Sequence, residues 1–385
     1  MPLDLKRPFI LDGATGTELQ KLGMERGACP EIWVLEHPEA IKKIQRAYAK
    51  AGSDCVYAPT FGANRASLKQ HGITTDIRRL CLNLVSLSRE AVPDTVLVAG
   101  DIAPCGLQLM PYGMATFEDL VDIYTEQAEA LEEAGVDFYA IETQMSIPEA
   151  RAALIAVKNV SKKPVLVSFA CNESGRSVMG ANLISALLSA QELGAYAYGI
   201  NCCGNMALIT KLLGDMRVYS RLPLISKPNA GLPDMSTGKA VYKMQPEAFA
   251  AAAEGFVKNG AAFLGGCCGT DDAHIAALST ATRNMNVLPP SPLRAAVAAS
   301  QSRVIEVTSD TTIIQKEITD DLLDAMEEVI EAGGELMKLH IRDEDDIEAV
   351  DDCQYGLSIP LCVSFESDAL KNAFLHIYNG KPYIL

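Results

Sequence analysis

The sequence predicts an α/β protein, a (β/α)8 TIM barrel with a smaller C-terminal α/β segment that amounts to half of such a barrel. Short apolar runs alternate with longer amphipathic segments along most of the chain. The apolar runs lack regular period-two alternation, which is typical of parallel strands buried on both faces. Several amphipathic segments end in glycine, as helices commonly do. Together these observations favour a parallel barrel with helices outside.

Eight apolar runs are the expected strands of the barrel. They cover 8–13, 54–61, 95–102, 137–143, 164–170, 195–201, 223–229 and 261–267. Helices are expected in the amphipathic segments, among them 38–52, 117–135, 147–160, 246–260 and, as the eighth, 271–285. The main alternative is a doubly wound open sheet, but GATG at 13–16 has the wrong glycine spacing for the nucleotide-binding turn of that fold.

The chain divides into three regions. Residues 1–288 form the expected barrel, and 289–303, rich in Pro, Ala and Ser, are expected to be a linker. In 304–385 the alternation resumes and predicts four strands and three helices, with the first strand over 302–309. Half a barrel has open edges, so we expect this segment to dock on another surface or to be the front of a longer protein.

Composition excludes several classes of function. The chain has 385 residues, 49% hydrophobic and 21% charged, as in ordinary soluble proteins. Its net charge of −16 disfavours nucleic-acid binding, because phosphate backbones are negative. No apolar run reaches the roughly 20 residues that cross a bilayer. The opening MPLDLKRPFILDG indicates mature protein rather than a signal peptide, and 11 cysteines without such a signal indicate reduced thiols in the cytoplasm.

Polar and thiol residues gather at the carboxyl ends of the expected strands, where parallel barrels form their active sites. These strand ends include Asp12, Gly13, Thr60, Phe61, Asp101, Glu142, Thr143, Asn201, Cys202, Cys203, Lys227, Asn229, Cys267 and Cys268. We therefore expect the chemistry of the protein at this end of the barrel.

Two of these strand ends carry adjacent cysteines, in GINCCGN (199–205) and GGCCGT (265–270). The two strands are next-but-one neighbours, so one metal ion can touch both ends. Thiolates prefer tetrahedral zinc at about 2.3 Å, and a catalytic zinc takes three protein ligands and leaves a fourth position open. Flanking glycines allow unusual backbone angles and close approach. Buried packing and a strained disulfide are the alternatives.

Isolated cysteines more often fill space in a core than bind a metal. We apply this interpretation to Cys55, Cys81, Cys171, Cys353 and Cys362, and leave Cys29 and Cys105 open. None of the five histidines has the spacing of a zinc-ligand motif.

Several motifs, taken in order, resemble the homocysteine S-methyltransferase family over residues 1 to about 288. They are LDGATGTELQ (11–20), PTFGANRASL (59–68), AIET (140–143), GINCCGN, SKPNAGLP (226–233) and GGCCGT. The resemblance is closest to the homocysteine-binding module of cobalamin-dependent methionine synthases. It implies a (β/α)8 barrel that holds zinc through Cys202, Cys267 and Cys268, with Cys203 beside the site or in the core.

The same resemblance implies how the amino-acid end of homocysteine is bound. Asp12 and Glu142 are expected to bind the substrate ammonium, with help from the backbone of Gly13 and Ala14. Four further residues are expected to line or shape the pocket: Thr60, Phe61, Asn201 and Asn229.

The segment after residue 303 resembles the opening of the pterin-binding barrel of methionine synthases, most clearly in DDLLDAMEEVIEAGG, PLCVSFES and ALKNAFLHIYNGKPYIL. It departs from that pattern at ELMKLHIRDEDD, where Arg342 and acidic residues replace an Asn-rich strand end. We therefore do not expect this segment to bind a pterin by itself.

The expected function is zinc-dependent methyl transfer to the thiol of homocysteine, which forms methionine. The expected donor is a methyl-corrinoid, itself methylated from methyltetrahydrofolate, so cobalamin is carried by another domain or protein. One alternative is a small donor, namely S-methylmethionine, S-adenosylmethionine or betaine. Another is a non-catalytic module that binds homocysteine or zinc and regulates a partner. Homocysteine and a corrinoid protein are thus the expected partners, and a homo-oligomer is compatible with the sequence.

Overall fold

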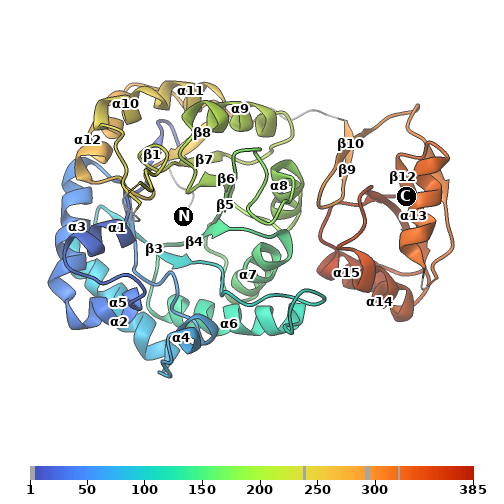
Figure 1. Ribbon diagram of the computed structural model, residues 1–385, viewed down its shortest axis with the longest axis horizontal. Helices are drawn as coiled ribbons and strands as arrows, with labels where there is room; N and C mark the ends of the chain where they lie inside the picture. The colour runs from blue at the N-terminus through green and yellow to red at the C-terminus, as the bar shows by residue number, and fades with distance from the viewer. Residues whose placement is uncertain (1–4, 237–239, 291–294, 320) are drawn as a thin grey trace.

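The computed structural model describes residues 5–236, 240–290, 295–319 and 321–385. Figure 1 shows a ring of strands enclosed by helices, with a smaller unit of strands and helices beside it. The predicted TIM barrel and the smaller C-terminal α/β segment are therefore both confirmed.

Eight parallel strands form the barrel, and each lies where the sequence predicts one. They are β1 (Phe9–Ile10), β2 (Cys55–Tyr57), β3 (Leu97–Ile102), β4 (Phe138–Gln144), β5 (Val165–Ala170), β6 (Ala197–Asn201), β7 (Leu224–Lys227) and β8 (Ala261–Leu264). Strands β2 to β8 each pair with the next strand in chain order, and β8 pairs with β1, whereas β1 and β2 are not paired as strands. Asp54 completes the ring between β1 and β2, because its backbone N–H donates to Ile10 O at 2.7 Å and its carboxylate accepts from the Ile10 N–H at 2.7 Å.

Twelve described helices surround these strands. They are α1 (Gly16–Lys21), α2 (Pro30–Glu36), α3 (Pro38–Ala51), α4 (Arg65–Gln70), α5 (Ile77–Ala91), α6 (Phe117–Glu133), α7 (Ile147–Val160), α8 (Leu183–Glu192), α9 (Met206–Arg217), α10 (Pro246–Ala251), α11 (Ala253–Lys258) and α12 (Asp272–Thr282). The single helix expected over 246–260 is divided into α10 and α11. Within the described residues, helices that are both long and apolar enough for a bilayer do not occur.

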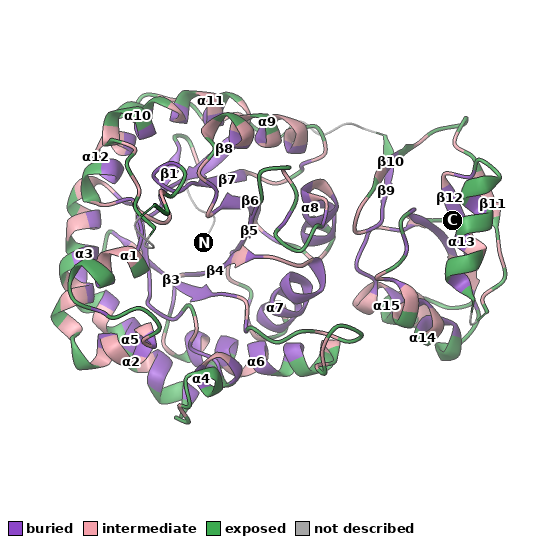
Figure 2. Cartoon of the chain, viewed as in Figure 1, coloured by how far each residue is buried: buried purple, intermediate pink, exposed green. Residues whose placement is uncertain are grey.

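Apolar side chains that point into the barrel fill the part of its interior away from the carboxyl ends of the strands. This inner cluster includes Phe9, Phe138, Leu166, Ile225 and Phe263, and every barrel strand contributes to it. Figure 2 shows the strands as predominantly buried, which is the reason that their sequences lack period-two alternation. The apolar filling ends near the carboxyl ends of the strands, and the next inward-facing positions are polar.

The C-terminal unit is a four-stranded parallel sheet with an antiparallel hairpin against it. The sheet strands are β11 (Ile313–Gln315), β12 (Leu336–Ile341), β13 (Leu361–Phe365) and β14 (Tyr383–Ile384), and the hairpin is β9 (Ala296–Ala299) with β10 (Val304–Val307). The helices are α13 (Leu322–Glu331), α14 (Glu344–Cys353) and α15 (Asp368–Ile377). The three predicted helices and the last three of the four predicted strands are thus present in the sheet unit, as α13 to α15 and β12 to β14.

The beginning of this unit differs from the prediction. The strand expected over 302–309 forms as β10, but it pairs antiparallel with β9, and the first strand of the parallel sheet is β11. Strand β9 lies inside the stretch 289–303 that the sequence suggests is a linker, of which residues 291–294 are outside the described residues. Ala298 packs on the C-terminal sheet and Val297 packs on Leu188 of α8, so the hairpin fills the space between the two units.

A buried arginine also joins the two units. Arg151 of α7 donates to the carbonyl oxygens of Leu375 at 2.6 Å and His376 at 3.1 Å, in the last turn of α15. Carbonyls in the last turn of a helix have no partner within the helix, so the Arg151 guanidinium supplies their hydrogen bonds. Its positive charge also interacts favourably with the negative end of the helix dipole. Burial lowers the pKa of Arg151 to about 10. In Figure 1 α15 accordingly lies across from α7, and the β9–β10 hairpin lies across from α8.

Candidate metal centre and substrate cavity

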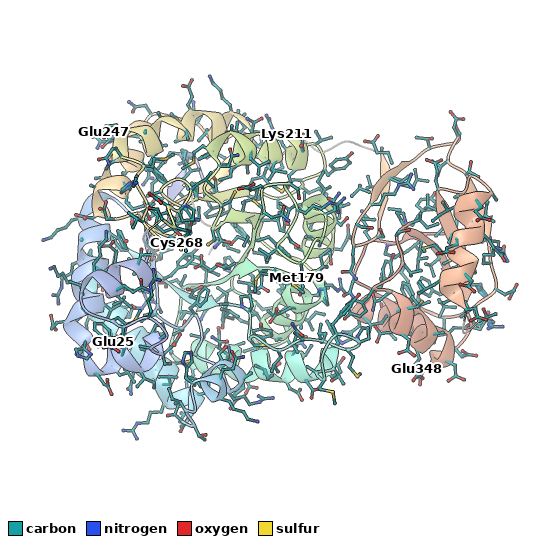
Figure 3. The ribbon with its side chains drawn as sticks, in the orientation of Figure 1. Glu25, Met179, Lys211, Glu247, Cys268 and Glu348 are labelled. Atoms are coloured by element: carbon teal, nitrogen blue, oxygen red, sulfur yellow. The ribbon has the colours of Figure 1, made fainter. Side chains whose placement is uncertain are left out.

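A cavity of about 280 Å³ opens at the carboxyl ends of the barrel strands. Its lining comes from the segments that follow strands on nearly all sides of the barrel, including Gly13, Phe61, Glu142, Cys202 and Cys268. Small-molecule sites in proteins commonly measure about 300–1,000 Å³, so this cavity suits a ligand the size of an amino acid. Figure 3 labels Cys268 at this end of the barrel.

Three thiols from two separate loops meet at this cavity, and we call them the thiol cluster. The Sγ atoms of Cys202, Cys267 and Cys268 all lie within 4.8 Å of one another, and those of Cys202 and Cys268 are 3.9 Å apart. Thiolates about 2.3 Å from one tetrahedral zinc ion would lie about 3.8 Å from each other. The donor type, the number of donors and their spacing therefore fit zinc.

Protons are shared unequally within the thiol cluster. Hydrogen bonding with the thiols of Cys202 and Cys267 lowers the pKa of Cys268 to about 3. Hydrogen bonding with Cys267 and Cys268, together with burial, raises the pKa of Cys202. The cluster therefore favours a thiolate, the form of cysteine that binds metals.

Cys202 is placed by an unusual backbone angle. Its φ is 51°, in the left-handed region that side chains with a Cβ rarely adopt. Thr143 at the end of β4 is similar, with φ of 58°. Asn201 holds Thr143: its amide donates to Thr143 Oγ1 at 2.7 Å, and its Oδ1 accepts the Thr143 N–H at 2.9 Å. Strained backbone of this kind clusters at functional sites.

The glycines of GGCCGT permit close packing more than unusual angles. A Cβ on Gly265 would lie 2.7 Å from Leu11 Cβ, and one on Gly266 would lie 2.3 Å from Thr270 Oγ1. Only Gly269 has a positive φ, of 81°. The loop can thus lie directly against the segment after β1, which directs Cys267 and Cys268 into the cavity.

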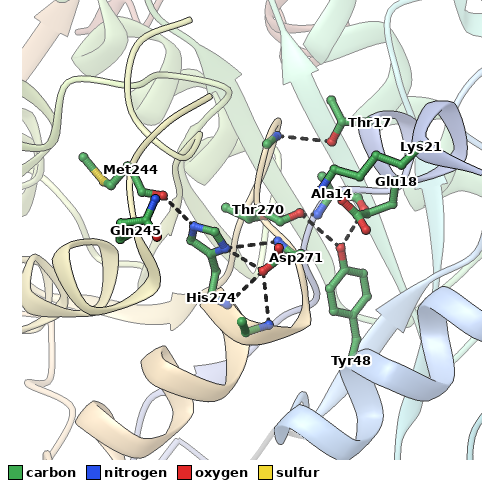
Figure 4. Close-up of polar contacts among 12 residues, drawn as sticks. Ala14, Thr17, Glu18, Lys21, Tyr48, Met244, Gln245, Thr270, Asp271 and His274 are labelled. Carbon is green, nitrogen blue, oxygen red and sulfur yellow. Dashed lines mark hydrogen bonds and ion pairs between the residues drawn. The ribbon is translucent and has the colours of Figure 1, made fainter. Parts of the chain in front are cut away.

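Side-chain hydrogen bonds join the loop after β8 to the loop after β1 (Figure 4). Thr270 Oγ1 accepts the N–H of Ala14 at 3.1 Å, and the Tyr48 hydroxyl donates to Ala14 O at 2.7 Å. Asp271 and His274 cap the start of α12. Gly13 and Ala14 both line the cavity, but the backbone N–H and C=O of Ala14 are engaged within the protein.

Cys203 does not join the thiol cluster. It is 6% exposed, belongs to the main hydrophobic core and lies beside Cys171, whose thiol hydrogen bonds to it. This hydrogen bond lowers the pKa of Cys203 to about 7. The two neighbouring cysteines of GINCCGN thus have different surroundings: Cys202 lines the cavity and Cys203 belongs to the core.

A buried cation separates the two acids that were expected to bind substrate. Lys227 Nζ lies 3.2 Å from Asp12 Oδ1 and 3.1 Å from Glu142 Oε2, and it sits 3.8 Å from the centre of the Tyr57 ring. We call Asp12, Glu142 and Lys227 the ion cluster. The Lys227 side chain is 5% exposed. The position of Lys227 at a strand end is predictable from the sequence, but its pairing with Asp12 and Glu142 is not.

Burial and pairing act in opposite directions on the ion cluster. Burial raises the pKa of Asp12, against the effect of Lys227, and it raises that of Glu142 to about 7. Burial disfavours the charge of Lys227, yet Glu142 and Asp12 raise its pKa well above the usual value. The lysine is therefore a fixed cation.

The remaining predicted residues take different places. Phe61 lines the cavity and is 41% exposed, whereas Thr60 is fully buried and donates to the backbone of Asp101. Asn201 holds Thr143, as described. Asn229 is buried, and its Oδ1 has no hydrogen-bond partner among the described residues.

Comparison with known proteins now identifies the family. A model of the homocysteine S-methyltransferase family matches residues 9–282. The chain therefore belongs to the homocysteine S-methyltransferase family, and the resemblance that the motifs indicate is confirmed.

Two curated relatives are methionine synthases, from Mycobacterium leprae and Mycobacterium tuberculosis. Each is 30% identical to this chain, over 73% of the chain and 25% of the relative. The chain thus spans about a quarter of the length that these relatives have. A crystal structure of the homocysteine methyltransferase MmuM from Escherichia coli in its metallated form is also similar, with a TM-score of 0.60 and 26% identity over 71% of this chain and 96% of that one.

Proposed function

We propose that this chain binds zinc through Cys202, Cys267 and Cys268 and transfers a methyl group to the thiol of homocysteine, forming methionine. The observation that carries the proposal is the thiol cluster, whose sulfur spacing fits one tetrahedral ion and whose residues line a cavity of amino-acid size. Membership of the family and the metallated state of the MmuM structure support it.

Zinc bound there would favour the ionised form of the substrate thiol and orient its sulfur toward the donor. This contribution matters because a free thiol has a pKa of about 8.5, so that only about 3% is ionised at pH 7. The chain's own residues supply the rest of the site. The left-handed angle at Cys202 and the close approach of Gly265 and Gly266 bring the thiols together.

We further propose that the methyl donor is a methyl-corrinoid carried by another domain or protein. Large apolar side chains are exposed on loops around the cavity, including Phe61 after β2, Met114 after β3, Met179 after β5 and Met235 after β7. Figure 3 labels Met179 on the loop between β5 and α8. Exposed apolar side chains in one region commonly mark an interaction surface. The methionine synthases that resemble this chain also extend well beyond it.

A self-contained methyltransferase with a small donor is the second candidate. The observation in its favour is that the similarity to MmuM covers 96% of that protein, so that a barrel alone is a homocysteine methyltransferase there.

The 11 free cysteines suit a reducing compartment, and we propose the cytoplasm.

One set of measurements tests both proposals. Zinc content, homocysteine binding and methionine formation are measured for the wild type, for Cys267→Ser and for the control Cys203→Ala, whose residue lies outside the thiol cluster. Methylcobalamin, S-methylmethionine, S-adenosylmethionine and betaine are supplied separately. We expect zinc, homocysteine binding and methionine from methylcobalamin in the wild type and control, and none in Cys267→Ser. A wild type that binds neither zinc nor homocysteine contradicts the proposed function. Methionine formed from a small donor without methylcobalamin contradicts the proposed corrinoid donor and supports the second candidate. Binding of zinc and homocysteine without turnover favours a regulatory module.

A further inference from the structure

Asp101 is a third acid in the cavity, and its position follows from the strand register. Asp101 of β3 pairs with Ala140 of β4, and Glu142 lies two residues further along β4. Residues two apart on a strand face the same side. Ala99 and Ala140 belong to the inner cluster of the barrel, so Asp101 and Glu142, each two residues beyond an inward-facing alanine, also point inward. Both line the cavity.

The other acids of the cavity already have partners. Glu31 accepts the Gly62 N–H at 2.6 Å and the Cys29 thiol at 3.2 Å. Asp12 and Glu142 share Lys227. Asp101 is only 6% exposed, and its Oδ1 has no hydrogen-bond partner among the described residues. A buried carboxyl oxygen without a partner is costly, so it indicates a contact that a ligand supplies.

Acidic groups also outnumber cations around the cavity, and burial and the neighbouring Glu142 raise the pKa of Asp101 well above its usual value, so that its ionised form would need a cation beside it. Glu31, Asp101 and Glu142 line it, with Asp12 just behind, whereas Lys227 is the one cation among its described lining residues. Lys227 is fixed between Asp12 and Glu142, at 3.2 and 3.1 Å. A ligand that carries a positive charge would therefore find an unpaired acid at Asp101, with Glu142 on the adjacent strand.

We propose that Asp101, together with Glu142, binds the ammonium group of the thiol substrate. Lys227 then serves as the counter-charge of Asp12, in the place where a substrate ammonium was expected. This inference rests on the proposed function, since it takes homocysteine as the thiol ligand of the zinc site. It changes the expected arrangement, in which Asp12 and Glu142 bind the ammonium. Asp101 then selects an amino acid over a thiol acid that lacks the amino group.

The test is equilibrium binding to the zinc-loaded protein, which requires no methyl donor. Homocysteine is compared with 4-mercaptobutanoate, which has the same thiol and carboxylate but no ammonium. The proteins are the wild type, Asp101→Asn and the control Asp94→Asn, an exposed aspartate just before β3. Zinc content and thermal unfolding are recorded for each.

We expect the wild type and the control to prefer homocysteine. In Asp101→Asn homocysteine should bind about 10- to 100-fold more weakly, the usual effect of losing a hydrogen bond to a charged group, while 4-mercaptobutanoate binds as before. Unchanged homocysteine binding in a folded, zinc-loaded Asp101→Asn overturns the proposal, as does equal weakening of both ligands. If the variant does not fold, a wild type that binds both ligands equally also overturns it. A wild type that binds no thiol at all contradicts the proposed function instead.

Discussion

The thiol cluster and the ion cluster lie in the same cavity, yet they treat charge differently. In the thiol cluster three sulfur atoms lie within 4.8 Å of one another and fit an ion that the chain does not itself supply. In the ion cluster the chain supplies the cation, because Lys227 lies between Asp12 and Glu142 at 3.2 and 3.1 Å. One cluster thus depends on an external ion for its charge balance, and the other is largely balanced by folding.

This difference suggests a division of labour. A site that takes its ion from solution can leave a coordination position open for substrate. A cluster that is balanced internally is rigid before substrate arrives, and such preorganisation lowers the cost of binding. The comparison predicts that the ion cluster is more important for stability and the thiol cluster for metal binding.

The largest effect on folding is expected from Lys227→Met, which keeps the shape of the side chain and removes the charge. Asp12 and Glu142 then remain buried without a counter-charge, so the free energy of unfolding should fall by about 3–5 kcal/mol. Urea denaturation measures this change. Lys211→Met is the matched control, because Lys211 pairs with Asp215 at an exposed site and should contribute no more than about 1 kcal/mol. Equal losses in the two variants would show that the ion cluster is not special.

The next effect concerns the thiol cluster. Structural zinc sites bind with about 10–16 kcal/mol through four ligands, so one thiolate contributes about 2.5–4 kcal/mol, or roughly 10²–10³-fold in affinity. Cys268→Ser should weaken zinc binding by this factor, as measured by competition with a coloured chelator.

Cys203→Ala is the control for that measurement, since Cys203 belongs to the hydrophobic core. Its zinc affinity should equal that of the wild type, even if packing beside Cys171 costs some stability. Loss of zinc in Cys203→Ala but not in Cys268→Ser would show that the proposed zinc ligands are wrong.

The two clusters were not equally predictable from the sequence. Adjacent cysteines between glycines form a pattern that few structures other than metal sites require, and the strand order then brings the two patterns together. Lys227, by contrast, is a single lysine after the apolar run PLIS, and nothing local distinguishes it from a residue at the surface. Its partners come from β4 and from the segment after β1, so only the closed barrel reveals the pairing.

The same limit applies to the C-terminal unit. Its helices and most of its strands follow from the apolar pattern, but β9 consists of Ala296, Val297, Ala298 and Ala299, which have little strand preference as a group. This stretch forms strand β9 of the hairpin because its small residues fit between α8 and the C-terminal sheet. Tertiary packing, which the sequence does not display, therefore decides the structure of that stretch.

The smallest effect is expected where the two clusters meet, at the end of β4 and β6. Asn201 holds Thr143 with hydrogen bonds of 2.7 and 2.9 Å, and Ser168 also donates to it at 3.1 Å. In Asn201→Ala these partners lose their bonds, and the free energy of unfolding should fall by about 1–3 kcal/mol. Asn229→Ala should cost less, because the Oδ1 of Asn229 has no partner to lose. Urea denaturation of both variants compares them, and a larger loss for Asn229→Ala would mean that Thr143 is held mainly by other contacts.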